Sequence, residues 1–274
     1  GFMDFFHPLI LALIQGITEF LPVSSSAHLV FPSQIWGWPD QGLSFDVAVH
    51  FGTLAAVMVY YRSWLGKLFA GFFNQPSASL GLGQIKENQY AGDVKLVKHL
   101  LFASIPVFMA GAVMEILIPD GIRSTFIIGI ATIIFGLVLY VADKKQGSKS
   151  EYDLVLKTAL IIGLAQVLAL IPGTSRSGIT IAAGLFLGMS ATGAANFSFL
   201  LSIPTILAAT ALKTLSLLGG DASVDWVTLG TGALISGVFA YLSISWFISF
   251  LNRVGMVPFV IYRLILGVLL LSVF

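Results

Sequence analysis

The stretch IPGTSRSG, residues 171–178, interrupts an otherwise apolar segment that runs from about 153 to 189. The stretch LPVSSS, residues 21–26, interrupts a second apolar segment, from about 3 to 36, in the same way. Proline removes a backbone donor and disfavours helix in the preceding residue, so each stretch predicts a break between two half-helices. Each segment is too short to cross a bilayer twice as two full helices. We therefore predict two re-entrant helix pairs, whose irregular turns line a polar cavity or are packed in protein.

The composition is that of an integral membrane protein. Of the 274 residues, 57% are hydrophobic and 10% are charged, and the mean hydropathy is +0.95. A water-soluble domain of this size needs more charge to cover its surface. The net charge of +1 gives no sign of nucleic-acid binding, and the lack of cysteine excludes disulfides, thiol catalysis and Cys-ligated zinc. The sequence also lacks a GxxxxGK[ST] loop and an HExxH helix, which argues against nucleotide-driven transport and zinc peptidase chemistry.

Six further apolar stretches are long enough to span a membrane. They cover approximately residues 45–62, 96–118, 124–142, 192–215, 226–250 and 257–273. The expected fold is therefore an all-α polytopic membrane protein, a single domain over residues 1–274. It would have six transmembrane helices and two re-entrant pairs, which makes ten helices.

The basic residues give this topology an orientation. One side of the membrane would receive the loops at 62–98, 143–157 and 251–256. These loops contain ten of the fourteen Lys and Arg residues, namely Arg62, Lys67, Lys86, Lys95, Lys98, Lys144, Lys145, Lys149, Lys157 and Arg253. The positive-inside rule assigns that side to the cytoplasm. Both termini are then expected on the periplasmic or extracellular side.

The two halves of the chain are similar to each other, which predicts an internal repeat. Residue pairs that are 150 positions apart include Pro22 and Pro172, Ser25 and Ser175, and Asp46 and Asn196. Each half, about 3–142 and 153–273, would contain one re-entrant pair and three spans. Because three is odd, the two repeats would be inverted, which places the broken helices face to face near the bilayer midplane. The alternative is chance similarity between apolar sequences.

The first break, QGITEFLPVSSSAH at residues 15–28, combines ionisable and hydroxyl side chains. Gln15 and Glu19 are four residues apart and share a helix face. A carboxylate inside an apolar segment is costly unless it is used, so Glu19 is a functional candidate. Ser25 and His28 are three residues apart, and the serine could be an N-cap or a nucleophile with a histidine base. With Glu19 nearby, we favour the nucleophile.

The second break, PGTSRSGIT at residues 172–180, has the composition of an anion site. Arg176 lies among hydroxyl groups and glycines where a helix should begin, and the backbone N–H groups and the helix dipole favour an anion there. The guanidinium adds a forked donor, and glycine lets the backbone approach closely. The alternative is an arginine that reaches for the membrane interface, but the neighbouring residues are small and polar rather than aromatic.

Other polar residues within the spans could complete such a site. Asp46 and His50 are one turn apart on the first span and could support it, or Asp46 could lie at the outer interface. Arg263 lies within the last apolar stretch and needs a partner there. A phosphate or Glu19 would serve.

These motifs resemble those of the undecaprenyl-diphosphate phosphatase family, known as UppP or BacA. Residues 15–28 are similar to the (E/Q)xxxE segment of that family with its serines and histidine, and residues 172–180 are similar to its PGxSRSxxT segment. The resemblance covers nearly the whole chain. It implies a ten-helix protein of the bacterial inner membrane that hydrolyses undecaprenyl diphosphate to undecaprenyl phosphate and phosphate, which recycles the lipid carrier for cell-wall synthesis. It also implies bacitracin resistance, with bacitracin competing for the polyprenyl diphosphate substrate.

Carried onto matching positions, the resemblance makes Glu19, Ser25, His28 and Arg176 the catalytic set. Ser25 would attack phosphorus with His28 as its base, Arg176 would hold the terminal phosphate, and Glu19 would orient His28 or bind a divalent cation, Mg²⁺ or Ca²⁺. Attack by His28 or by water is the alternative, and no organic cofactor is expected. The residues expected to bind substrate are Gln15, Ser24, Ser26, Thr174, Ser175, Ser177, Thr180 and Arg263.

Two observations leave other interpretations open. Gln15 stands where many members of the family have glutamate, which argues against a metal site with two carboxylates. A secondary transporter or flippase for a polyprenyl phosphate lipid would also have inverted repeats, broken helices and charge at the midplane. A homodimer is a further open expectation.

Overall fold

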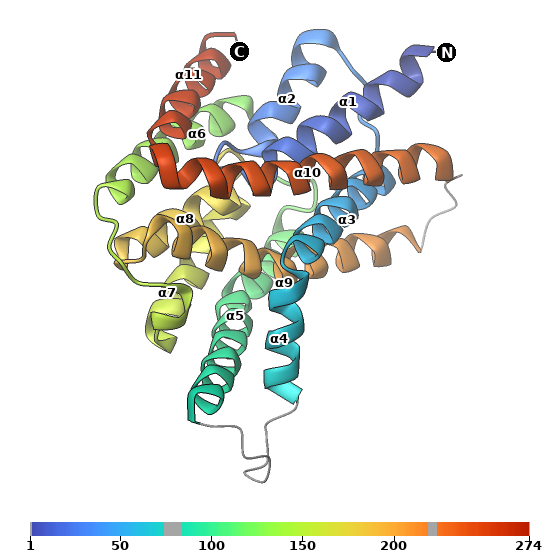
Figure 1. Ribbon diagram of the computed structural model, residues 1–274. Helices are drawn as coiled ribbons and strands as arrows, with labels where there is room; N and C mark the ends of the chain where they lie inside the picture. The colour runs from blue at the N-terminus through green and yellow to red at the C-terminus, as the bar shows by residue number, and fades with distance from the viewer. Residues whose placement is uncertain (1, 74–83, 219–223, 274) are drawn as a thin grey trace.

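The structure is a computed structural model and describes residues 2–73, 84–218 and 224–273 (Figure 1). The described residues form eleven α-helices, two short 3₁₀ helices (η1 and η2) and no β-strand. The helices are α1 (Phe2–Thr18), α2 (Ser25–Trp36), α3 (Leu43–Tyr60), α4 (Arg62–Phe73), α5 (Gln84–Leu117), α6 (Thr125–Asp143), η1 (Glu151–Asp153), α7 (Leu156–Val167), η2 (Leu168–Leu170), α8 (Arg176–Phe186), α9 (Ala191–Leu217), α10 (Trp226–Val254) and α11 (Val257–Val273).

The predicted spans correspond to helices of the structure. Five of the six, α3, α5, α6, α9 and α10, are long and apolar enough to cross a membrane. The sixth, α11, is apolar but has only 17 residues. The structure adds α4, which lies in a stretch that we expected to be a loop, so the described chain has eleven α-helices rather than ten. Among the ten basic residues used for the orientation, Lys86 lies outside the described side chains.

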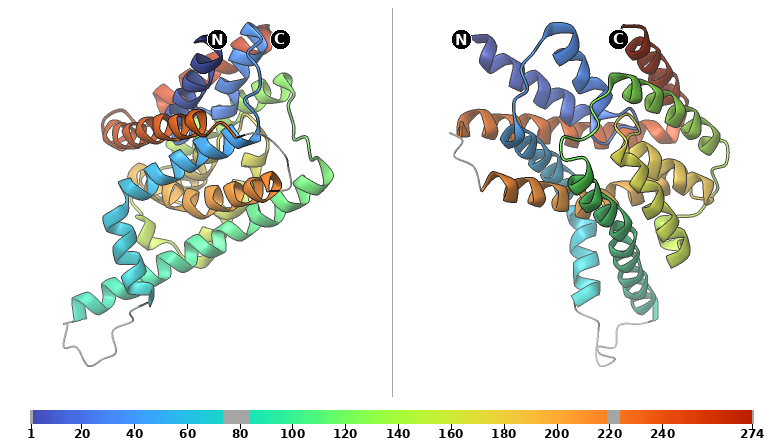
Figure 2. Two further views of the ribbon diagram at one scale, coloured as in Figure 1. Left: turned by 90° about the vertical axis from the view of Figure 1, so that its right-hand side faces the viewer. Right: turned by 180° about the vertical axis from the view of Figure 1, so that it is seen from behind.

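The arrangement of the helices agrees with an even number of crossings. The first turn of α1 and the last turn of α11 lie at the same end of the molecule in every view (Figures 1 and 2). Helix α4 and the first half of α5 project from the opposite end (Figure 1). Both ends of the described chain therefore lie at one end of the molecule, and their location on the periplasmic side of a membrane stays a prediction.

Several helix contacts occur in pairs, as two inverted repeats would produce. Helix α1 packs on α10 as α7 packs on α5, and α3 packs on α10 as α9 packs on α5. Glycine permits the closest approach in the first two contacts. A Cβ atom on Gly16 of α1 would lie 2.5 Å from the carbonyl oxygen of Ser236, and one on Gly163 of α7 would lie 2.2 Å from that of Ala103. The repeat bounds at about 3–142 and 153–273 stay a prediction.

The two breaks have the same backbone conformation. Ser24 has φ 71° and ψ 107°, and Ser175 has φ 69° and ψ 114°, and they are the only non-glycine residues with positive φ in the described chain. Each serine caps the helix that follows it, because its Oγ accepts from the backbone N–H of Ala27 or of Gly178. The capping serines are 151 positions apart, so pairing Ser25 with Ser175 was wrong by one residue.

Hydrogen bonds join the two breaks directly. The backbone N–H of Gly173 donates to Ser26 Oγ at 3.0 Å, and Ser177 Oγ donates to the carbonyl oxygen of Leu21 at 3.1 Å. Ser26 and Ser177 occupy equivalent positions, two residues after the capping serine. Both had been expected to bind substrate, and both have a partner in the opposite break. The N-termini of α2 and α8 are therefore held next to each other.

The guanidinium of Arg263 fastens the two breaks together. The side chain is fully buried, and its Nη1 donates to the carbonyl oxygens of Pro22 at 3.2 Å and Thr174 at 3.0 Å. Its Nη2 donates to that of Gly173 at 2.9 Å and its Nε to that of Thr132 at 3.1 Å. Four of its five N–H groups are thus used by backbone carbonyls rather than by the anionic partner expected from the sequence.

Replacing Gly173 by alanine is expected to destabilise the protein. Gly173 has φ 97°, and an added Cβ would lie 2.3 Å from the carbonyl oxygen of Ile128. We expect a loss of about 2 kcal/mol or more, measured as a lower midpoint of thermal unfolding in detergent. The control is Gly111→Ala on α5, where an added Cβ has no neighbour within 4 Å. Equal midpoints for the two variants would contradict the prediction.

Replacing Arg263 by lysine is expected to lower stability by about 3 kcal/mol, because one ammonium group cannot reach four carbonyl oxygens in the plane of a guanidinium. Thermal unfolding in detergent is again the measurement. Arg253→Lys, at an exposed position in the last turn of α10, is the matched control and should unfold as wild type does. If the Arg263 variant has an unchanged unfolding midpoint and a raised KM, then Arg263 binds substrate, as the sequence analysis predicted, rather than stabilising the fold.

Candidate active site

Arg176 is the first residue of α8, and its guanidinium is only partly satisfied. Its Nη1 donates to the carbonyl oxygen of Ser198 at a long 3.4 Å, and the guanidinium lies 5.9 Å from the centre of the Phe20 ring. Its Nε and Nη2 are buried and have no hydrogen-bond partner among the described residues. Burying unpaired charged donors is costly. The Arg176 guanidinium can therefore bind an anion through Nε and Nη2.

The hydroxyl groups behind Arg176 support its helix. Thr180 Oγ1 lies 2.6 Å from Ser198 Oγ and donates to the carbonyl oxygen of Arg176 at 2.9 Å. Ser175 is used as the helix cap, and Thr174 Oγ1 is buried without a partner among the described residues. Of the hydroxyls expected to bind substrate in the second break, Thr174 therefore has the most unused capacity.

Glu19 follows the last residue of α1 and is held by the side chain one turn earlier. Gln15 Nε2 donates to Glu19 Oε2 at 2.6 Å, and the same nitrogen lies 3.4 Å from His50 Nε2 on α3. The structure therefore fixes the Glu19 carboxylate at the end of α1 through Gln15. That Glu19 and Arg176 act on one ligand stays a prediction.

Asp46 belongs to the edge of this region. Its carboxylate is 3.9 Å from Lys213 Nζ, and both side chains are about half exposed. Its backbone carbonyl accepts from His50 Nδ1. Of the two interpretations of Asp46, the outer interface fits its exposure better than a direct role in the site.

The three serines of the first break have different environments. Ser24 caps α2, and Ser26 bonds Gly173 of the other break. Ser25 Oγ has no hydrogen-bond partner among the described residues, and its side chain is half-buried. Because Ser25 and Arg176 are the first residues of α2 and α8, they lie at two helix N-termini that the cross-break bonds hold together. Such N-termini favour an anion between them.

No hydrogen bond joins His28 to Ser25 among the described residues, in contrast to the role as base expected from the sequence. Its Nδ1 lies 2.6 Å from the carbonyl oxygen of Ser24, and its Nε2 is hydrogen-bonded to the Tyr262 hydroxyl. The His28 and Tyr262 rings are also stacked. No hydrogen bond joins His28 to Glu19 in the described structure, so the expected orientation of His28 by Glu19 is absent. Tyr262 lies 234 positions away from His28, and the sequence analysis did not predict it as a partner of His28.

An apolar groove begins beside His28 and Tyr262. It has a volume of about 460 Å³ and lies between α1, the first break, α10 and α11. Its wall includes Ile17, Leu21, Val23, Trp246, Phe250 and Phe259. A groove of this composition can hold a hydrocarbon chain but offers few polar partners.

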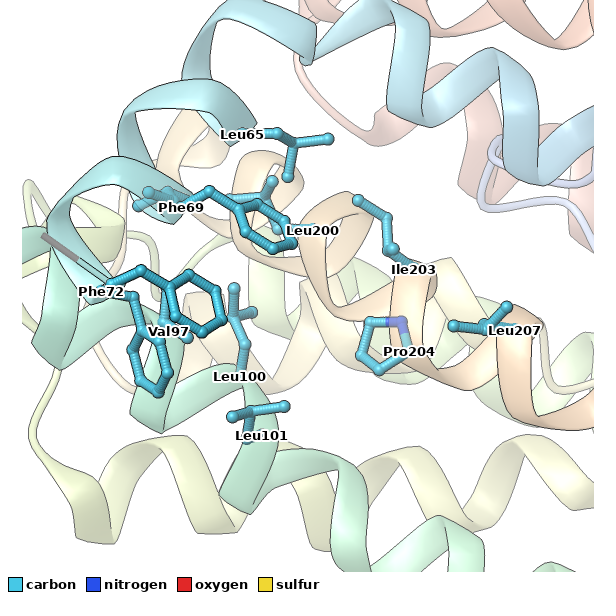
Figure 3. A pocket seen from close by; sticks show the side chains of 12 residues that line it. Leu65, Phe69, Phe72, Val97, Leu100, Leu101, Leu200, Ile203, Pro204 and Leu207 are labelled. Carbon is cyan, nitrogen blue, oxygen red and sulfur yellow. The ribbon is translucent and has the colours of Figure 1, made fainter.

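A second hollow, of about 340 Å³, lies between α4, α5 and α9 (Figure 3). Its wall is entirely apolar, with Phe69 and Phe72 of α4 facing Leu200 and Pro204 of α9. It contains no group that could bind a phosphate. This hollow therefore offers no site for phosphate chemistry.

A metal ion would need most of its ligands from elsewhere. Among the described residues, no three His, Asp or Glu side chains come together in a way that could hold one. Glu19 supplies one carboxylate, and its neighbour Gln15 is an amide whose N–H points toward it. One carboxylate together with phosphate oxygens and water is a common set of ligands for Mg²⁺. The site fits a cation that arrives with a phosphorylated ligand.

Comparison with known proteins agrees with this geometry. The family model described as "Bacitracin resistance protein BacA" matches residues 8–269. A protein named undecaprenyl-diphosphatase from Teredinibacter turnerae is 53% identical over 98% of this chain and 98% of its own length. Another from Campylobacter curvus is 52% identical over 99% of this chain and 100% of its own length. A third, from Alcanivorax borkumensis, is 53% identical over 98% of each chain. The chain therefore belongs to the BacA family of bacitracin resistance proteins.

Proposed function

We propose that this protein hydrolyses undecaprenyl diphosphate to undecaprenyl phosphate and inorganic phosphate, and so recycles the lipid carrier for cell-wall synthesis. Its membership of the BacA family and the name undecaprenyl-diphosphatase of its relatives support this function. The observation that carries it is the buried guanidinium of Arg176, with two nitrogens unpartnered among the described residues, at the meeting point of two helix N-termini.

The surroundings of Arg176 suit a substrate with an anionic head and a hydrocarbon tail. The terminal phosphate would lie against Arg176 and the N-termini of α2 and α8, which all favour negative charge. The apolar groove beside the first break, about 460 Å³ in volume, offers a path for the first isoprene units of the tail. Both ends of such a molecule thus find a matching environment close to one break.

Charge stabilisation by Arg176 would account for most of the rate, because phosphoryl transfer places charge on the equatorial oxygens of the transferred group. In the first step Ser25 Oγ would give its proton to a base and form a bond to the terminal phosphorus, while the bond from that phosphorus to the bridging oxygen breaks and undecaprenyl phosphate leaves. A water molecule would then cleave the phosphoserine and release phosphate. Glu19 is the one carboxylate of residues 15–28, whereas His28 would have to leave Ser24 and Tyr262 to act as base or nucleophile. Direct attack by water is the alternative.

The remaining assignments concern the cation and the location. Glu19 would hold a divalent cation, Mg²⁺ or Ca²⁺, together with diphosphate oxygens. We place the protein in the bacterial inner membrane with both termini and the mouth of the site on the periplasmic side, which the distribution of basic loops and the half-exposed Asp46 near the site support. Bacitracin would act by competing for the lipid substrate. A homodimer stays a prediction.

The direct test measures phosphate release by the purified protein in detergent with farnesyl or undecaprenyl diphosphate. We expect one phosphate per substrate from the wild type and a loss of about 100-fold or more for Arg176→Met. Because the substitution removes a buried charge whose Nε and Nη2 have no partner among the described residues, the unfolding midpoint of the variant should not fall.

Arg123→Met is the control for this substitution, since Arg123 is exposed and, among the described residues, bonds only the backbone of Asp120. It should retain both activity and stability. Substrate binding by the wild type without phosphate release would refute the phosphatase and favour a lipid transporter or flippase.

Replacing Ser25 by alanine tests the nucleophile. We expect activity to fall by about 10³-fold with little change in stability, because Ser25 Oγ makes no hydrogen bond with the described residues. Ser24→Ala should instead cost about 1 kcal/mol of stability, since it removes the cap of α2. Activity near the wild-type level in Ser25→Ala would exclude Ser25 as the nucleophile. A phosphohistidine trapped in that variant would assign the attack to His28.

A further inference from the structure

We propose that His50 is a positioning residue that fixes the carboxylate of Glu19 through the side-chain amide of Gln15. The inference rests on the proposed phosphatase function and adds a residue of α3 to the site. It concerns three side chains from two helices and the first break, in the order His50, Gln15 and Glu19. His50 itself touches neither Glu19 nor Arg176 through a hydrogen bond in the described structure.

The first step concerns the tautomer of His50. Its Nδ1 lies 2.7 Å from the backbone carbonyl oxygen of Asp46, one helical turn earlier. A carbonyl oxygen can only accept, so Nδ1 must carry the hydrogen. In the neutral ring Nε2 is then an acceptor. The carboxylate of Asp46 does not compete for the ring, because it faces Lys213.

The second step concerns the two hydrogens of the Gln15 amide nitrogen. That nitrogen lies 2.6 Å from Glu19 Oε2 and 3.4 Å from His50 Nε2. Each acceptor can take one hydrogen, so both hydrogens are used. Turning the amide over would place its oxygen against the Glu19 carboxylate and the His50 lone pair, which both repel it. The lone pair of His50 therefore favours the orientation in which Gln15 donates to Glu19.

The third step concerns what is lost without that acceptor. Gln15 is only 2% exposed, so water cannot replace His50 as a partner for the second hydrogen. A buried donor without an acceptor is unfavourable, and the amide gains rotational freedom when nothing fixes its second hydrogen. Glu19 then loses its fixed place relative to Arg176. Small displacements of a reacting or charge-bearing group are enough to slow a reaction substantially.

A double-mutant cycle tests this chain of contacts. The readout is kcat and KM for phosphate release from farnesyl diphosphate in detergent. We expect His50→Leu to lower kcat about 10-fold while KM changes less than about twofold. His50→Gln, whose side-chain oxygen can accept from Gln15, should recover most of the activity. In a Gln15→Leu background, adding His50→Leu should change kcat less than about twofold, because the connection is already removed.

Controls separate positioning from folding and from the function itself. Arg123→Met, at an exposed position outside this chain of contacts, should leave kcat unchanged. If His50→Leu does not fold, His50→Ala, which also lacks an acceptor, replaces it in the cycle. A loss of equal size in both backgrounds, or a raised KM, would overturn the positioning role. Wild-type activity in folded His50→Leu would overturn it while leaving the phosphatase intact, whereas no phosphate release by the wild type would overturn both.

Discussion

The structure depends on the hydrogen bonds between the guanidinium of Arg263 and the backbone carbonyls of the two breaks. A broken helix leaves carbonyl oxygens without donors, and at membrane depth no water is available to satisfy them. A buried guanidinium has the opposite need, five donors without acceptors. Arg263 meets four carbonyls, three of them from the breaks, so each group offsets the cost of the other. This pairing aligns the N-termini of α2 and α8.

The two buried arginines differ in how fully they are satisfied, and this difference separates scaffold from site. Arg263 uses four of its five N–H groups on the backbone, whereas Arg176 has only a long bond to Ser198 and two nitrogens unpartnered among the described residues. A guanidinium whose N–H groups nearly all have acceptors stabilises the fold, while one with N–H groups that lack acceptors is available to a ligand. Arg176 is thus held in a costly state by a scaffold that Arg263 stabilises.

Much of this organisation could be predicted from the sequence, because its causes are local. The clusters of proline and serine predicted both helix breaks, and the length of the apolar stretches predicted the membrane spans. The glycines and hydroxyl groups around Arg176 indicated an anion site. Short helix α4 was missed because it carries charges next to a span. The partners of Arg263 could not be predicted, because they are backbone carbonyls and every residue type has one. The partner of His28 could not be predicted, because Tyr262 is 234 positions away in the sequence. The sequence also could not show that Ser24 rather than Ser25 caps α2, because the φ and ψ angles of the break decide which serine is the cap.

The bonds that join the breaks also set an order of assembly. The carbonyl of Pro22 receives its donor from a residue 241 positions later, and the hydroxyl of Ser26 receives its donor from a residue 147 positions later. During synthesis the first break is therefore made long before either donor. Its turn can reach the bonded arrangement only after Gly173 and then Arg263 of α11 have been made. The joining of the two breaks is thus a late step in the assembly of this protein.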